Sequence, residues 1–380
     1  MHRLLTLCLF ASSAHAHGGK LAAEGLFYQG DELVAISANF GLLSRTPQGF
    51  EWACFDNLTS VPFEGFYHRG SWYAMTRTGL FESSDKGCNW APVGDSLAGQ
   101  PVHGLRQDGD ALVVRAQRLP AVGQLHRDEG QGFAAWGAPL PEGELLDFTV
   151  RPSDRSVFAL VQDDGQDPSL WVSDSTMEAW RLVESLEGLS YPKFIDLRLG
   201  EDQLVIAAFR VAAGELLALS ATNELSRRTQ LPTPVQEGRT HENEHWVITL
   251  TGVPLKAIGD GPFLPAEGPE HCMAYKGDRM VACGDIDHRH FVLERIEGGF
   301  TPRYPFEDLQ GPACVDNGCN VRWAQLQSTW LSQNDADPIV DTGQPVEPAG
   351  GCGCVAATLD SLVWALALVF GRRRRPCSTA

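Results

Sequence analysis

The string HENEH, from His241 to His245, contains the residue types of a zinc-binding site. In the HExxH pattern two histidines one helical turn apart bind the metal, and the glutamate activates a water molecule. That chemistry requires a helix, so that both imidazole rings point the same way. Here the string runs directly into WVITL from Trp246, whose β-branched residues favour a strand. We therefore expect a turn at this position, and no metal or other cofactor.

A second group of potential metal ligands is the string DIDHRH, from Asp285 to His290. In an extended chain its side chains would alternate between two faces, which would put His288 and His290 on the same face. Isolated His and Asp residues are also common in exposed turns. We interpret the string as an exposed connection between strands.

The elements that carry these strings recur along the chain. A polar turn followed by a strand-sized apolar run occurs seven times at intervals of about 41 residues, within the period of propeller blades made of four short strands. The apolar runs are LVAIS from Leu33, WYAMT from Trp72, LVVRA from Leu112, VFALV from Val157, LVIAA from Leu204, WVITL from Trp246 and MVACG from Met280. A further strand-like segment begins at Gly41, Gly79, Gly123, Ser169, Glu215, Pro254 and His290. The sequence predicts an all-β, seven-bladed β-propeller of four-stranded antiparallel blades over residues 17–312.

How the ring closes is left open by the sequence. The segment from Lys20 to Phe27 could begin the first blade or complete the seventh. After the last blade, a cap over residues 313–334 contains a cysteine pair and a short helix. Its residues Trp323, Leu326 and Trp330 fall on one helical face, so we expect them to pack against the propeller.

The N-terminus has the layout of a secretory signal. Arg3 precedes an apolar stretch from Leu4, and the small-residue site Ala14-His15-Ala16 follows. We expect residues 1–16 to be removed and the protein to be exported. The formal net charge of −18 disfavours nucleic acid and anionic lipid as partners.

Export makes disulfide bonds the expected state of the cysteines. Cys272 and Cys283 flank a turn symmetrically and would face each other across a two-stranded hairpin. We expect two further bridges, Cys314 with Cys319 around a small loop, and Cys54 with Cys88 between the first two blades.

The C-terminal region changes in composition. Residues 335–350 form a polar linker rich in Pro and Gly, and residues 351–380 contain Cys352, Cys354, a short apolar run and four arginines. The arginines are Arg372, Arg373, Arg374 and Arg375. This order of elements resembles the MYXO-CTERM sorting tail of exported bacterial proteins. The resemblance implies that the tail is cut and that Cys352 or Cys354 carries a lipid at the cell surface. An ordinary single-span anchor is the alternative, and in either case the membrane is contacted only through the tail.

One turn carries a recognisable motif. Ser83, Asp85, Gly87 and Trp90 have the spacing S-x-D-x-G-x-x-W, and SRTPQGFEW from Ser44 and VSDSTMEAW from Val172 look like degraded copies. The motif resembles the Asp-box, or BNR repeat, of sialidase- and sortilin-like β-propellers. The resemblance implies a structural role, in which the aspartate accepts hydrogen bonds from the turn, the glycine supplies a positive φ and the tryptophan packs between sheets.

The sequence does not identify catalytic residues. The early Arg-Ile-Pro motif of sialidases is absent, and none of the six tyrosines lies in a recognisable catalytic frame. The carboxylate pair of a plain glycosidase depends on spatial separation, which sequence spacing does not give. We therefore expect a surface-anchored, non-enzymatic propeller that binds an extracellular protein or glycan. The alternatives are a sialidase-like surface glycoside hydrolase and an assembly factor for a surface complex.

Overall fold

The computed structural model describes the chain from residue 25 to residue 327, with gaps. The described residues are 25–37, 41–47, 49–53, 58, 62–76, 78–94, 96–97, 100, 102–118, 122–197, 203–210, 213–268, 272–276, 279–284, 290–296, 299–305, 308–312, 314, 320–321, 323–324 and 327. The chain divides into two units, Met1–Leu331 and Ser332–Ala380, and all of the described residues belong to the first. The expected signal, the linker, Cys352, Cys354 and the terminal arginines lie outside them, as do Cys54, Cys319 and the segment 285–289.

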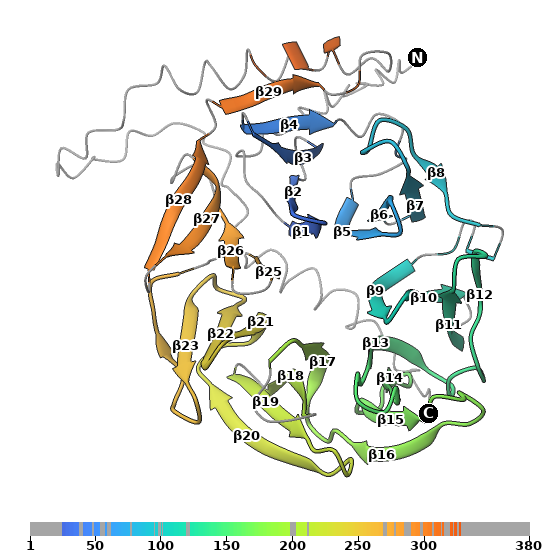
Figure 1. Ribbon diagram of the computed structural model, residues 1–380. Helices are drawn as coiled ribbons and strands as arrows, with labels where there is room; N and C mark the ends of the chain where they lie inside the picture. Colours follow the sequence, from blue (N-terminus) through green and yellow to red (C-terminus); the bar gives the residue numbers. More distant parts are fainter. Residues whose placement is uncertain are drawn as a thin grey trace, which may run out of the picture. The chain divides into compact units, whose positions relative to one another are not determined.

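The described residues form seven antiparallel blades in a ring, which confirms the predicted β-propeller (Figure 1). Blade 1 contains β1 (Gly25–Gln29), β2 (Glu32–Ser37), β3 (Gly41–Thr46) and β4 (Gly49–Ala53). Blade 2 contains β5 (Pro62–His68), β6 (Ser71–Thr76), β7 (Gly79–Ser83) and β8 (Ala91–Pro92). Blade 3 contains β9 (Val102–Asp108), β10 (Ala111–Arg118), β11 (Val122–Asp128) and β12 (Phe133–Ala135). Blade 4 contains β13 (Glu144–Val150), β14 (Val157–Gln162), β15 (Ser169–Ser173) and β16 (Arg181–Ser185).

The remaining three blades have the same order. Blade 5 contains β17 (Ser190–Ile195), β18 (Leu204–Arg210), β19 (Ala213–Leu219) and β20 (Leu225–Leu231). Blade 6 contains β21 (Val235–His241), β22 (Glu244–Thr249), β23 (Pro254–Ile258) and β24 (Leu264–Pro265). Blade 7 contains β25 (Met273–Lys276), β26 (Arg279–Cys283), β27 (His290–Ile296) and β28 (Gly299–Pro305). Each predicted apolar run forms the second strand of its blade, and each further segment forms the third.

The second strands are apolar throughout because a blade is covered on both faces by its neighbours. In β14, Val157 to Val161 are all buried, which is the pattern of a strand packed on two sides. The hydrophobic clusters accordingly lie between blades. One cluster joins Phe158 and Leu170 of blade 4 to Phe194 and Ile206 of blade 5. The stability of each blade therefore depends on the blades on either side of it.

The ring closes through a segment that follows the last blade. β1 pairs with β2 as the innermost strand of blade 1, so the N-terminal segment begins that blade. The closing element is β29 (Leu309–Pro312), which pairs in parallel with β4 as a fifth strand of blade 1 (Figure 1). Trp323 then packs on this blade, with its ring 5.4 Å from that of Trp52. Leu326 and Trp330 of the expected helix lie outside the described residues.

Two disulfide bonds are present among the described residues. Cys272 pairs with Cys283, as predicted, with 5.1 Å between their Cα atoms. The other predicted pairings were wrong, because Cys314 pairs with Cys88, 226 residues away. Sequence spacing favours local partners, whereas the closure of the ring brings the end of the propeller next to blade 2. The segment from β29 to Cys314, here called the strap, thus joins blade 1 non-covalently and blade 2 covalently.

No helix among the described residues has the length and apolar character needed to cross a lipid bilayer.

The two disulfides should contribute unequally to stability. A bridge restricts the unfolded chain more when it closes a longer loop, so removing Cys88–Cys314 by double alanine substitution should lower the free energy of unfolding by about 3–5 kcal/mol. The matched Cys272→Ala, Cys283→Ala variant, which opens a loop of sequence separation 11, should lose only about 2–3 kcal/mol. Guanidinium denaturation of the full-length protein measures both losses. Equal losses would contradict a special role for the strap.

Candidate functional site

The HENEH string forms a hairpin turn, as the sequence predicts. His241 ends β21 and pairs with Glu244 at the start of β22, and Glu242 in the turn has a positive φ of 53°. The His245 ring makes a hydrogen bond of 2.9 Å to Thr240, whereas the His241 ring lies against Tyr275. The two histidines do not converge, and no group of three or more His, Cys, Asp or Glu side chains within the described part of the chain is arranged to hold a metal.

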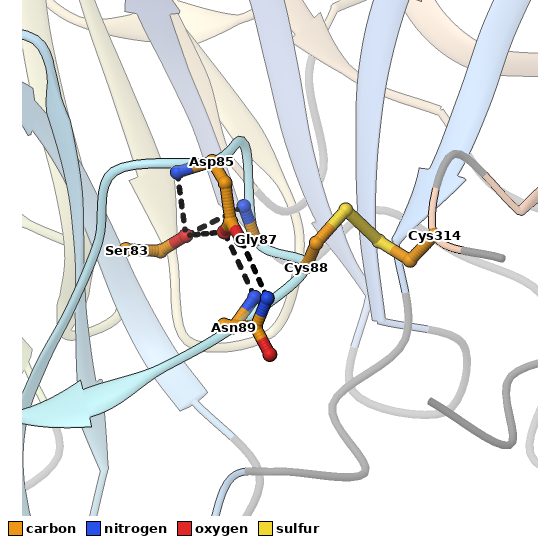
Figure 2. The surroundings of a disulfide bond; sticks show 6 residues. All are labelled: Ser83, Asp85, Gly87, Cys88, Asn89 and Cys314. Carbon is orange, nitrogen blue, oxygen red and sulfur yellow. Dashed lines mark hydrogen bonds between the residues drawn. A yellow bond between two sulfur atoms is a disulfide. The ribbon is translucent and has the colours of Figure 1, made fainter. Parts of the chain in front are cut away.

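The turn between β7 and β8 is organised by Ser83 and Asp85 (Figure 2). The Ser83 hydroxyl accepts a hydrogen bond from the Gly87 amide at 2.8 Å and donates to Asp85. Asp85 accepts hydrogen bonds from the Asn89 amide at 2.8 Å and from its side chain at 2.6 Å. Gly87 has a φ of 86°, and a Cβ there would lie 3.1 Å from Trp72. The position therefore requires glycine both for its backbone and for the close approach of its neighbour.

Burial alone would raise the pKa of Asp85, but the hydrogen bonds from Asn89 and Ser83 together lower it. Trp90, at the end of the turn, packs in the cluster between blades 1 and 2 that also contains Cys314. The turn presents Cys88 to the strap, so its geometry positions the covalent closure (Figure 2).

Equivalent turns occur in blades 3 and 4. Asp128 accepts hydrogen bonds from the amides of Gly130 and Gly132 at 2.6 and 2.9 Å. Asp174 accepts from the Thr176 amide at 2.9 Å. The second of these lies in the VSDSTMEAW string, but the sequence analysis missed Asp128. Its signal was an aspartate followed by glycines two and four residues later, directly after a third strand.

Charged side chains of the first strands form a network that links blades 2, 3 and 4. Arg106 of β9 lies 3.7 Å from Glu64 of β5 and 3.3 Å from Asp147 of β13. Asp147 also accepts a hydrogen bond of 2.8 Å from the Phe194 amide of β17. These first strands are the ones that line the centre of the ring (Figure 1). We call Glu64, Arg106 and Asp147, with the groups of blades 5 and 6 described next, the inner-strand network.

Blades 5 and 6 continue this network. Arg239 of β21 pairs with Asp196 at 2.8 Å and with Glu237 at 3.1 Å. Lys193 of β17 donates to the Gln236 carbonyl of blade 6. Arg106 therefore pairs with two carboxylates in blades 2 and 4, and Arg239 pairs with two carboxylates in blades 5 and 6.

Burial raises the pKa of Glu64, and Arg106 opposes this effect. Burial likewise raises the pKa of Glu237, and Arg239 opposes this effect. Burial lowers the pKa of Lys193. The Glu64 side chain keeps 40% of its surface exposed, but protein surrounds it from several blades. These residues share no motif, so they could not be identified from the sequence.

A separate pocket of about 570 Å³ lies at the turns between the first and second strands of blades 2, 3 and 4. We call it the arginine pocket, after Arg69, Arg127 and Arg155, which line it together with Asp108 and Glu129. Arg155 donates to Asp108 at 2.7 and 3.1 Å, and Arg127 lies 3.0 Å from the same carboxylate. The pair with Asp108 raises the pKa of Arg155. Arg127 also pairs with Glu129 at 3.0 Å.

The three turns of this pocket were recognisable from the sequence only as turns. HRGS from His68, QDGDA from Gln107 and PSDRS from Pro152 supply Arg69, Asp108 and Arg155. The sequence nevertheless contained a signal for the pocket, because the equivalent turns of consecutive blades in a propeller must lie side by side. Two of the three turns contain an arginine, and both arginines have a positive φ, of 48° at Arg69 and 59° at Arg155.

Comparisons with known proteins find similarity only at the level of the fold. No family model and no curated protein matches the chain. The extracellular domain of a putative one-component system from B. thetaiotaomicron is 10% identical, with a TM-score of 0.53 over 75% of this chain and 38% of that chain. A puromycin hydrolase mutant complexed with PGG is 14% identical, with a TM-score of 0.52 over 79% of this chain and 55% of that chain.

A computationally designed protein, Ika8, is 10% identical, with a TM-score of 0.47 over 76% of this chain and 98% of its own. This chain thus spans less than two thirds of the two natural chains. At these identities the likeness to the extracellular domain and to the puromycin hydrolase mutant shows the fold and nothing finer.

Replacing Asp85 by asparagine should weaken the turn in a pH-dependent way. The pKa of Asp85 is lowered from its ordinary value of 3.8, so the ionised carboxylate stabilises the folded protein fully above that pH and less as the pH falls below it. Because the side chain is partly exposed, Asp85→Asn should cost about 1 kcal/mol at pH 7. Thermal unfolding between pH 7 and pH 2.5 measures the difference, which should shrink below about pH 4. Asp164→Asn, in an exposed turn, is the matched control, and a difference that stays constant down to pH 2.5 would refute this assignment.

Proposed function

We propose that the protein is an exported, surface-anchored β-propeller that recognises an extracellular glycan or protein and does not catalyse a reaction. The observation that supports this proposal is the inner-strand network. Glu64 and Asp147 share Arg106, and Glu237 and Asp196 share Arg239. Carboxylates that are held by fixed cations are suited to holding neighbouring strands in place more than to exchanging protons.

The network also supports a rigid binding surface. Contacts of the inner strands connect blade 2 to blade 3, blade 3 to blade 4, blade 4 to blade 5 and blade 5 to blade 6. A scaffold that is ordered before binding loses little conformational entropy when a ligand arrives. The loops on either face of the ring are then presented in fixed positions, which is the arrangement expected of a recognition module.

One observation favours a second candidate, a surface glycoside hydrolase. Burial raises the pKa of both Glu64 and Glu237, and carboxyl groups with raised pKa values at a concave site are candidates for general acids. In this second candidate the two glutamates act from opposite sides of the ring on one glycosidic bond. The arginine beside each carboxylate argues against it, because it favours the charged form.

The terminal segments support the cellular location in this proposal. Residues 1–16 have the layout of an export signal, and the segment 351–380 has that of a sorting tail with Cys352 and Cys354. A lipid on either cysteine would hold the propeller at the cell surface.

Measurements of ligand binding and of product release should distinguish a recognition module from a glycoside hydrolase. We expect the full-length protein, purified in mild detergent, to retain at least one member of a panel of polysaccharides, sialosides and surface proteins, without releasing products. The Glu64→Gln and Glu237→Gln variants should then bind as the wild type does. Hydrolysis that either substitution lowers by more than about 100-fold, the scale of a lost general acid, would establish the hydrolase instead. Glu184→Gln, on the exposed strand β16 and outside both the inner-strand network and the arginine pocket, is the control.

The anchoring can be tested independently. In cells of the natural source, the Cys352→Ser, Cys354→Ser double variant should appear in the culture medium, while the wild type should remain with the membrane fraction. Cell fractionation and incorporation of labelled fatty acid measure the two properties. Retention of the double variant in the membrane fraction, with the tail still attached, would indicate a single-span anchor.

A further inference from the structure

We propose that the arginine pocket binds the carboxylate of an acidic sugar, a hexuronic acid unit of an extracellular polysaccharide. This inference rests on the proposed recognition function and assigns it a site and a ligand class. It concerns the face of the ring that carries the turns between first and second strands, and it does not involve the inner-strand network.

Three cations converge in the arginine pocket, although the protein as a whole is acidic. The chain has a net charge of −18, yet Arg69, Arg127 and Arg155 come from three consecutive blades to one pocket. Arg69 makes no ion pair within the described part of the chain. Its guanidinium lies over Gly130, where a Cβ would be 2.2 Å from Nη1. The absence of a side chain at that position is what allows Arg69 to reach across from blade 2 to blade 3.

Three acidic residues, Asp108, Asp110 and Glu129, also line the pocket, and Asp108 and Glu129 differ in their exposure and in their partners. Asp108 keeps only 6% of its side chain exposed and holds both Arg127 and Arg155, so it is a fixed part of the pocket. Glu129 keeps 68% exposed and pairs with Nη1 of Arg127. An exposed ion pair of this kind contributes little free energy, so a ligand carboxylate can replace Glu129 on Arg127 and gain Arg69 as a second partner.

The orientation of Arg127 favours this exchange. Its guanidinium lies 4.9 Å from the centroid of the Trp136 ring, which restricts the plane of its donors. Its buried Nε has no hydrogen-bond partner among the described residues. A planar guanidinium fixed in this way matches the planar, bidentate geometry of a carboxylate.

The rest of the lining favours a sugar over a peptide. The volume of about 570 Å³ is that of a site for a small ligand. Only Ala111, Val150 and Pro152 contribute apolar side chains, whereas Gln107 and Asp110 offer donors and acceptors for hydroxyl groups.

Calorimetric titration of the full-length protein tests the proposal. The probes are oligogalacturonate of three units, the matched neutral galactose trisaccharide and an acidic peptide of equal charge. We expect oligogalacturonate to bind at least 10-fold more tightly than either of the others. Arg69→Gln should weaken this binding by about 10-fold or more, as expected for a lost charge-assisted hydrogen bond. Glu129→Gln should tighten it about 3-fold, because it removes a weak exposed ion pair.

Arg181→Gln, on the exposed strand β16, makes the same change of charge outside the pocket and should leave binding unaltered. Equal unfolding temperatures of Arg69→Gln and Arg181→Gln show that the folds are comparable. Binding of oligogalacturonate that neither pocket variant alters would overturn the site while leaving the recognition function in place. Preference for the neutral sugar or the peptide would overturn the ligand class. Retention of a surface protein with no affinity for any sugar would overturn the inference and leave the proposed function standing.

Discussion

The Cys88–Cys314 disulfide and the pairing of β29 with β4 are the interactions on which the ring depends. Each blade buries its two faces against its neighbours, so an open ring would expose a full apolar face on both blade 1 and blade 7. The strap keeps the ring closed by binding the end of the propeller to blades 1 and 2. The four antiparallel strands of each blade are consecutive in the chain, so closure adds β29 to blade 1 as a fifth strand and replaces none of the four.

The strap also connects a local motif to the global fold. Ser83 and Asp85 fix the turn after β7, Gly87 allows Trp72 to approach it, and Cys88 within that turn carries the covalent link (Figure 2). The hydrogen bonds of one short turn therefore determine whether the distant end of the propeller can be attached. The similar turns at Asp128 and Asp174 have no such link, and they order the connections of blades 3 and 4 alone.

The sequence predicted the strands because a buried strand has a local signature. The runs from Leu33 to Met280 each formed the second strand of a blade, and the turn at HENEH followed from the strand after it. Long-range partners have no comparable signature. Cys88 and Cys314 are separated by 226 residues, and Glu64, Arg106 and Asp147 come from three blades. Their proximity depends on the curvature of the ring and on blade order. The arginine pocket could be predicted in part. Its turns were recognisable from the sequence, but the orientation of the turns relative to one another was not.

The strap has a mechanical consequence for the C-terminal anchoring that we propose. Tension applied to the chain beyond Cys314 passes through a covalent bond into blade 2 before it reaches β29 or blade 7. The load therefore does not peel the last blade from the ring, which is the weak point of a circular stack of sheets. Under the proposed anchoring, the load is carried instead by the Asp85 turn and by the packed interface of blades 1 and 2.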